Sequence, residues 1–147
     1  MSNHYQSILV AVDGSQEAEY ALQKAINSAK RNVGSKLTIV NIIDSRIFET
    51  LNRSVYEGIQ EDSNELLNGY KEKAEAAGLE NVQTFVEIGS PKVVITGTIA
   101  DKVNADLIVC GATGHNAIER FLMGSVSAAI VRTARCDVLV IRTETGE

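Results

Sequence analysis

The sequence predicts an α/β protein built on an open, doubly wound sheet of five parallel strands. Short runs rich in Val, Ile and Leu alternate along the 147 residues with longer segments of helical period. The runs are almost continuously apolar, which is typical of strands that are covered on both faces. Parallel neighbours require long crossover connections, and the segments between these runs have the period of helices. Helices are therefore expected on both faces of the sheet.

The first part of the chain reads strand, helix, strand. Strands are expected at residues 7–13 and 36–44. Ser15 can cap the intervening helix, which carries one apolar stripe and stops near Gly34.

The middle of the chain is less regular. A long, mostly polar segment runs from about residue 46 to 77, and Gly58 and Gly69 weaken its helical pattern. Its apolar residues nevertheless keep the helical period, and Gly78 fits a helix stop. The run at 82–88 predicts the third strand.

The last part supplies two more helices and two more strands. Ser90 is expected to cap a helix that has Pro91 at its first position, where a missing N–H is harmless. Strands are expected at 106–111 and 137–142, with a short amphipathic helix at 126–134 between them. The final strand is expected at a sheet edge, where a hydrophobic strand can recruit another chain.

Composition excludes several classes of protein. Apolar residues make up 44% of the chain and the net charge is −5, with no basic cluster of the kind that nucleic-acid binding requires. The longest apolar runs, of about eight residues, are too short to span a membrane, and the first residues lack the pattern of a secretory signal. We expect a single domain over residues 1–147, located in the cytoplasm.

The cysteines agree with a reducing compartment. Cys110 and Cys136 each border an apolar run, which favours buried, reduced side chains over a disulfide or a metal pair. His4 and His115 are the only histidines, so a zinc site would have few ligands.

The strongest functional signal is the stretch "GATGHNAIERFLMGSVS", which starts at Gly111. Ligands of open parallel sheets collect at the carboxyl ends of the strands. Gly111 and Gly114 can adopt positive φ and let a ligand approach the backbone, and Gly124-Ser125 opens a helix whose first N–H groups attract anions. This pattern predicts a cradle for phosphate oxygens. The alternative is that the glycines only end a strand and begin a helix.

Other candidate residues have ordinary explanations as well. Asp13 suits either a ligand site or a simple turn, and Arg120 suits either a phosphate contact or a solvated surface. His115 is more typical of an exposed loop than of a catalyst. The stretch is not a P-loop, because no Gly-Lys-Ser/Thr closes it. The chain also lacks a dinucleotide fingerprint, because the first turn, "VDGSQEA", does not have the G-x-G-x-x-G spacing.

Three motifs resemble those of the universal stress protein family, and the resemblance extends along the chain from end to end. The motifs are "ILVAVDGS", "GSPKVVI", and G-x2-G-x9-G-S followed by "CDVLVIR". The last motif is similar to that of the ATP-binding branch. The resemblance implies a Rossmann-like sheet of order 3-2-1-4-5, a bound adenine nucleotide, and a homodimer whose copies pair antiparallel through the strand Asp137–Arg142. ATP, or AMP or ADP, is the implied ligand, with Mg²⁺ held through the phosphates.

The resemblance also implies roles for individual positions. Asp13 would lie at the ribose and adenine end, and the backbone of Ile42 would contact the adenine. The full set of implied nucleotide-binding residues is Ala11, Val12, Asp13, Ile42, Gly111, Thr113, Gly114, His115, Gly124, Ser125 and Val126. This chain has His115 where many members carry a basic residue, and Asn41 where many carry histidine.

The leading hypothesis is a regulatory protein of the stress response that switches dimers or partners when it binds ATP. A slow ATPase is one alternative, although no positioned base or arginine finger stands out and we expect little or no turnover. A dimeric interaction module with a vestigial pocket is another. A phosphorelay receiver is not favoured, because Glu87-Ile88-Gly89 ends the third strand and no lysine follows the fifth.

Overall fold

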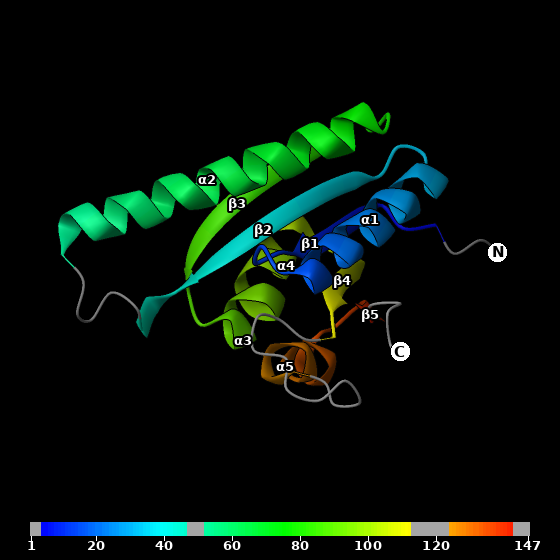
Figure 1. Ribbon diagram of the computed structural model, residues 1–147. Helices are drawn as coiled ribbons and strands as arrows, with labels where there is room; N and C mark the ends of the chain where they lie inside the picture. Colours follow the sequence, from blue (N-terminus) through cyan, green and yellow to red (C-terminus); the bar gives the residue numbers. More distant parts are fainter. Residues whose placement is uncertain (1–3, 47–51, 113–123, 143–147) are drawn as a thin grey trace.

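The computed structural model describes residues 4–46, 52–112 and 124–142. Its strands form one five-stranded sheet of order β3-β2-β1-β4-β5, and every neighbouring pair is parallel. The strands are β1 (Ser7–Ala11), β2 (Lys36–Asp44), β3 (Val82–Gly89), β4 (Leu107–Gly111) and β5 (Asp137–Ile141). The predicted fold class and strand order are thereby confirmed, and β5 lies at an edge of the sheet (Figure 1).

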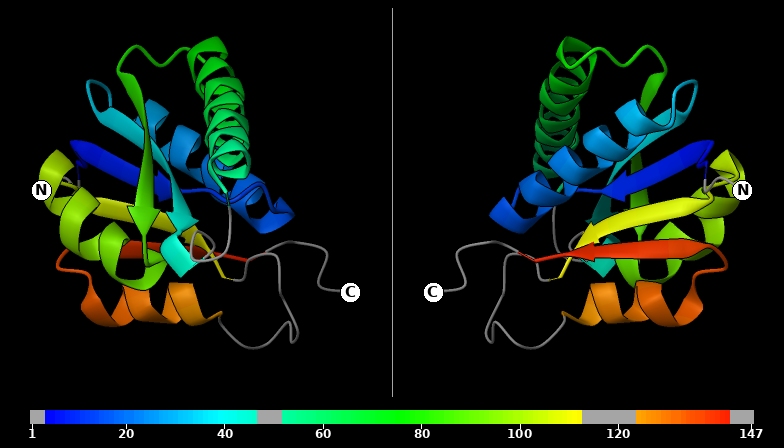
Figure 2. Two further views of the ribbon diagram at one scale, coloured as in Figure 1. Left: turned by 90° about the vertical axis from the view of Figure 1, so that its left-hand side faces the viewer. Right: turned by 90° about the vertical axis from the view of Figure 1, so that its right-hand side faces the viewer.

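Helices cover both faces of this sheet (Figure 2). They are α1 (Gln16–Arg31), α2 (Arg53–Ala76), α3 (Pro91–Val93), the π-helical segment η2 (Val94–Ile99), α4 (Ala100–Val103) and α5 (Ser125–Thr133). No helix in the described part of the chain is long and apolar enough to cross a membrane.

The core is divided by the sheet into two apolar layers, because alternate strand residues point to opposite faces. Ile8 and Val10 of β1 pack against α1 and α2, whereas Leu9 packs on the other face against η2 and α5. Cys110 is buried in this second layer, as expected, whereas Cys136 is only half-buried beside it; both are free thiols. Burial raises the pKa of the Cys110 thiol to about 11.

Helix α1 begins as the sequence predicts. The hydroxyl of Ser15 accepts a hydrogen bond from the Ala18 N–H at 3.1 Å, which satisfies one of the free amides of the first turn. The preceding strand is shorter than expected, because β1 ends at Ala11 rather than at residue 13. Gly14 then turns the chain with a φ of +85°.

Helix α2 is continuous through Gly58 and Gly69, so the helical interpretation of this segment is confirmed. It starts at an Asn52 cap and ends before Gly78, whose φ is +104°. One side of the helix packs on the sheet, with Ser63, Leu67, Tyr70 and Ala74 buried. Tertiary packing of this stripe compensates for the low helix propensity of the two glycines.

The crossover from β3 to β4 differs from its prediction. Pro91 is at the first helical position, but the Ser90 side chain makes no capping hydrogen bond. The Val93 N–H, which such a cap would use, donates instead to the Ser90 carbonyl at 3.0 Å. The expected regular helix is also interrupted by η2, where the Ala100 N–H bonds the Ile95 carbonyl, five residues back.

Candidate functional site

The predicted site residues that the structure describes gather at the carboxyl edge of the sheet. Ala11 ends β1, Ile42 lies near the end of β2, Gly111 ends β4, and Gly124 precedes α5 (Figure 1). The side chains of Ala11 and Ile42 belong to the apolar layer that packs against α5. The ends of these strands and the start of α5 therefore lie close together at the carboxyl edge of the sheet. Thr113, Gly114, His115 and Arg120 lie outside the described residues.

The two ends of the glycine-containing stretch meet through Ala112. Its carbonyl accepts hydrogen bonds from the Gly124 N–H at 2.7 Å and from the Ser127 hydroxyl at 2.7 Å. Ser127 is buried, so this contact fixes the start of α5 beside the end of β4. Ser127 was not singled out in the sequence, although its place on the buried side of a short helix indicates a structural hydroxyl.

The first turn of α5 presents main-chain N–H groups at this junction. Gly124 is the N-cap residue and has no side chain, so no side-chain cap covers the turn. The amides of Ser125 and Val126 therefore lie at the positive end of the helix dipole. Such a turn is suited to an anion, and the Ser125 hydroxyl adds a further donor at the same end.

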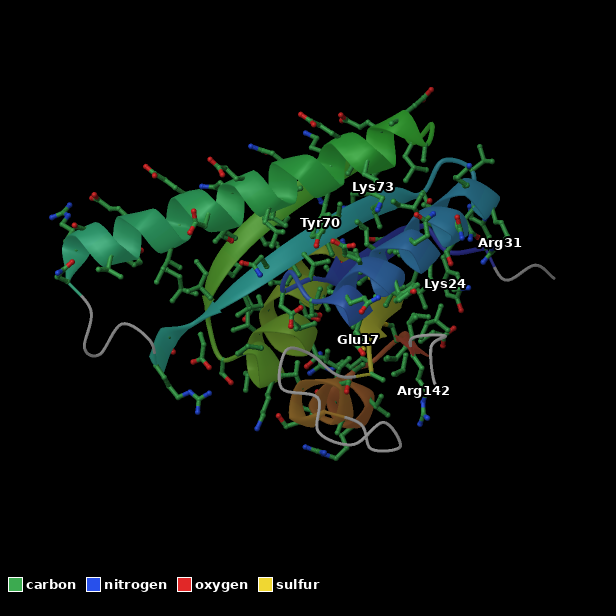
Figure 3. The ribbon with its side chains drawn as sticks, viewed as in Figure 1. Glu17, Lys24, Arg31, Tyr70, Lys73 and Arg142 are labelled. Atoms are coloured by element: carbon green, nitrogen blue, oxygen red, sulfur yellow. The ribbon has the colours of Figure 1, made fainter. Side chains whose placement is uncertain are left out.

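Gly111 has a different role from the one its sequence context suggests. Neither Gly111 nor Gly124 adopts a positive φ. A Cβ at Gly111 would lie 2.9 Å from the Cβ of Glu17 and 3.2 Å from the Glu17 carbonyl carbon. The absence of a side chain is thus required by the close approach of α1, whose first turn carries Glu17 (Figure 3). The expectation of a positive φ at this glycine was wrong, whereas its place beside a ligand stays a prediction.

Asp13 lies in the turn between β1 and α1. One of its carboxylate oxygens accepts a hydrogen bond from the Ser15 N–H at 2.9 Å, which is the ordinary role of an aspartate in a turn. Helix α2 lies close to this turn, since a Cβ at Gly14 would lie 4.0 Å from Leu66 Cδ2, and Tyr70 is a buried side chain of the same helix (Figure 3). Burial, followed by the negative charges of Glu19 and Asp13, raises the pKa of the Tyr70 phenol. The phenol is therefore uncharged at neutral pH, and the negative charges close to it are those of Glu19 and Asp13.

The backbone of Ile42 points toward the space beyond the end of β1. Along β2, even-numbered residues bond β1, as the pairs Lys36 N–H to Gln6 carbonyl and Val12 N–H to Val40 carbonyl demonstrate. The Ile42 N–H and carbonyl have the same direction, because this direction repeats every second residue. The regular pairing of β1 has already ended at Ala11.

Asn41 connects this edge to helix α2. Its Nδ2 donates to the Val12 carbonyl at 2.7 Å, and its Oδ1 accepts a hydrogen bond from the Ser63 hydroxyl. Ser63 is only 6% exposed. The sequence drew attention to Asn41 but not to Ser63. A serine on the otherwise apolar stripe of α2 was the available signal, because a buried hydroxyl requires a partner.

Asp44 and Arg46 form an exposed ion pair at the end of β2, with 2.6 Å between Asp44 Oδ2 and Arg46 Nη2. Hydrogen bonds from the Arg46 side chain and backbone lower the pKa of the Asp44 carboxyl to about 2. Asp44 is therefore fully ionised at neutral pH.

Comparison with known proteins agrees with this architecture. A family model described as the universal stress protein family matches residues 4–142. A protein of Staphylococcus saprophyticus that carries the universal stress protein name is 55% identical over 143 residues, covering 95% of this chain and 85% of that protein.

Solved structures give the same result. The universal stress protein UspA from Lactobacillus plantarum has a TM-score of 0.81 and 28% identity, and the match covers 96% of this chain and 100% of that one. A universal stress protein solved in complex with cAMP has a TM-score of 0.67 and 29% identity, over 95% of this chain and 98% of that one. This chain belongs to the universal stress protein family.

Proposed function

We propose that this protein binds an adenine nucleotide at the carboxyl edge of its sheet and acts as a nucleotide-dependent regulatory protein of the stress response. The observation that carries the proposal is the junction at Ala112, which holds the uncapped first turn of α5 beside the strand ends. A helix N-terminus attracts phosphate, and ligands of open parallel sheets bind beside the carboxyl ends of the strands. The related protein that was solved with cAMP supports an adenine ligand.

Each part of the nucleotide has a proposed partner. The amides of Ser125 and Val126, with the Ser125 hydroxyl, bind the phosphates, and the backbone of Ile42 contacts the adenine. Asp13 lies at the ribose end, next to Ala11 and Val12. Gly111 and Gly124 shape the junction, and Thr113, Gly114 and His115 complete the phosphate cradle in our proposal.

Main-chain donors are sufficient for useful affinity. A hydrogen bond to a charged group contributes roughly 1.5–3 kcal/mol, so three or four such donors support micromolar binding without a lysine. If the ligand is ATP, Mg²⁺ accompanies it through the phosphate oxygens and water. The free thiols Cys110 and Cys136 agree with a role in the reducing cytoplasm.

Calorimetry with ATP, ADP and AMP tests the proposal on the wild-type protein and on Gly124→Val. The backbone of Gly124, with φ −67° and ψ 164°, is open to any residue, so valine introduces bulk without backbone strain. We expect micromolar binding by the wild type and at least tenfold weaker binding by Gly124→Val. Gly97→Val is the control, because a Cβ there would meet no atom within 4 Å.

Equal heats for the wild type and Gly124→Val would contradict the proposal. A second measurement identifies the natural ligand. Freshly purified protein is denatured, and the released small molecule is identified by mass spectrometry. Release of AMP, ADP or ATP in near-stoichiometric amount is the expected result.

We also propose that two copies pair through β5. This strand lies at the sheet edge, and Leu139 on it is 38% exposed. A hydrophobic edge strand with unpaired backbone groups favours antiparallel pairing with a second copy. Light scattering at micromolar concentrations should give the mass of a dimer. Leu139→Lys should shift the mass toward the monomer, and a monomeric wild type would refute the pairing.

A further inference from the structure

The Asn41 amide has one possible orientation in its contacts. A carbonyl oxygen only accepts hydrogen bonds, so the atom that faces the Val12 carbonyl at 2.7 Å must be the donor Nδ2. Oδ1 then faces α2 and accepts the hydroxyl hydrogen of Ser63. The Val12 carbonyl therefore selects the orientation of the asparagine side chain, and the hydroxyl of the buried Ser63 holds it by donating to Oδ1.

This contact replaces a rung of the parallel ladder. After the bond from the Val12 N–H to the Val40 carbonyl, the regular next rung joins the Ile42 N–H to the Val12 carbonyl. That rung does not form between these two described residues, and the Val12 carbonyl accepts from Asn41 instead. The side chain of Asn41 thus bonds the carbonyl that the regular ladder would pair with the Ile42 N–H.

The Ile42 N–H and carbonyl that point past the end of β1 have a definite chemical preference. An N–H donor next to a carbonyl acceptor complements the edge of adenine, where N1 accepts and the N6 amino group donates. Hypoxanthine and guanine present the opposite pattern, because their N1–H donates and their O6 accepts. A site built on hydrogen bonds discriminates strongly against a ligand that leaves those groups unpaired.

We infer that Asn41, oriented by Ser63, is a positioning residue that keeps the backbone of Ile42 open and thereby makes the site select adenine over 6-oxopurines. The inference rests on the proposed nucleotide-binding function and adds to it a determinant of base specificity. It also gives α2 a part in the site, since Ser63 is its contact with the strand edge.

Asn41→Leu removes the amide at similar volume, and Ser63→Ala removes only the hydroxyl that orients it. Affinities for ATP and for ITP, its hypoxanthine counterpart, are measured by calorimetry. The wild type should prefer ATP by at least about tenfold. In Asn41→Leu the preference should fall toward parity, and in Ser63→Ala it should fall partway, while ITP binding changes little.

Gln83→Ala provides a matched control. It removes another side-chain hydrogen bond on β2, from Gln83 Nε2 to Thr38 Oγ1 at 3.1 Å, at the opposite end of the strand. A purely structural role for Asn41 would weaken ATP and ITP binding together and leave their ratio unchanged. We expect the Gln83→Ala variant to keep the wild-type ratio.

A second readout does not depend on any nucleotide. In the ligand-free protein, the Ile42 amide hydrogen should exchange with solvent readily, because its ladder acceptor is occupied by Asn41. In Asn41→Leu the rung to Val12 can close, and exchange at Ile42 should slow by roughly tenfold or more.

The outcomes separate the two proposals. ATP binding by the wild type together with an unchanged ATP preference in Asn41→Leu would overturn the role of Asn41 and leave the proposed function intact. Unchanged exchange at Ile42 would overturn it as well. A wild-type protein that binds neither nucleotide would refute the proposed function, and the specificity role with it.

Discussion

Replacing Gly111 with alanine tests whether this glycine serves the packing of the fold or the approach of a ligand. The new Cβ would lie 2.9 Å from the Glu17 Cβ and 3.2 Å from the Glu17 carbonyl carbon and oxygen. Two of these three atoms belong to the backbone of α1, so rotation of a side chain does not relieve the contact. The first turn of α1 or the end of β4 must move.

The expected loss of stability follows from this overpacking. An extra group forced into a tight contact costs roughly 1–3 kcal/mol. For a domain of 147 residues, each kcal/mol lowers Tm by about 2–4 °C, so Gly111→Ala should melt about 2–12 °C below the wild type. Calorimetry or circular dichroism of the ligand-free protein measures the shift.

Gly69→Ala is the matched control. Gly69 lies in the interior of α2, and a Cβ there would meet no atom within 4 Å. Alanine should stabilise this helix by roughly 0.5–1 kcal/mol, because it loses less backbone entropy than glycine on folding. If ligand-free Gly111→Ala melts at the wild-type temperature, the close approach of α1 does not explain why this position is glycine. A role of Gly111 in ligand access would then be the better explanation.

Three further predictions follow from local contacts. Ser15→Ala should lower the unfolding free energy by about 1 kcal/mol in chemical denaturation, because the Ala18 N–H loses its cap. The Asp44 carboxyl should titrate near pH 2 by NMR, and Arg46→Ala should raise its pKa toward the ordinary value of 3.8. Since this pKa is lowered by folding, the pair stabilises the protein above about pH 3.8 and is lost as the pH falls toward 2. The Cys110 thiol, with a pKa of about 11, should resist dithionitrobenzoate at pH 8 in the native state and react after unfolding.

Each of these predictions has its own control. Ser15→Thr keeps the capping oxygen and should retain most of the stability, so a loss equal to that of Ser15→Ala would argue against capping. An Asp44 midpoint that does not move in Arg46→Ala would exclude the arginine as its cause. The cysteine experiment uses Cys136→Ser so that one thiol remains, and rapid labelling of the native variant would contradict the burial of Cys110.

The sheet and its helices were predictable because their signals are local. Apolar runs of strand length, one helical stripe and the Ser15 cap each depend on residues within a few positions of one another. The bounds of β2 agree with the predicted 36–44. Both faces of this strand are covered, so every residue of the apolar run is part of the sheet. The ordering of the strands required the family resemblance, since local pattern does not determine which strands are neighbours.

The candidate site was predictable only in part. Its location followed from the general rule for open parallel sheets and from the glycine-containing stretch after β4. The positive φ expected at Gly111 was wrong, and the close contact with Glu17 was missed because it joins residues from different elements. Ser90 was expected to cap a helix by its side chain, but the Ser90 backbone carbonyl takes the amide instead.

The amino-acid sequence alone determined the fold class of this protein and the order of its elements along the chain, and it pointed to the region that we propose as the ligand site. These properties arise from hydrophobic periodicity and capping, which act over a few residues. Only the tertiary structure decided that Asn41 meets Val12, 29 positions away, and Ser63, 22 positions away. Such contacts depend on the register of the strands and on how α2 lies across the sheet, and no local pattern encodes either of them.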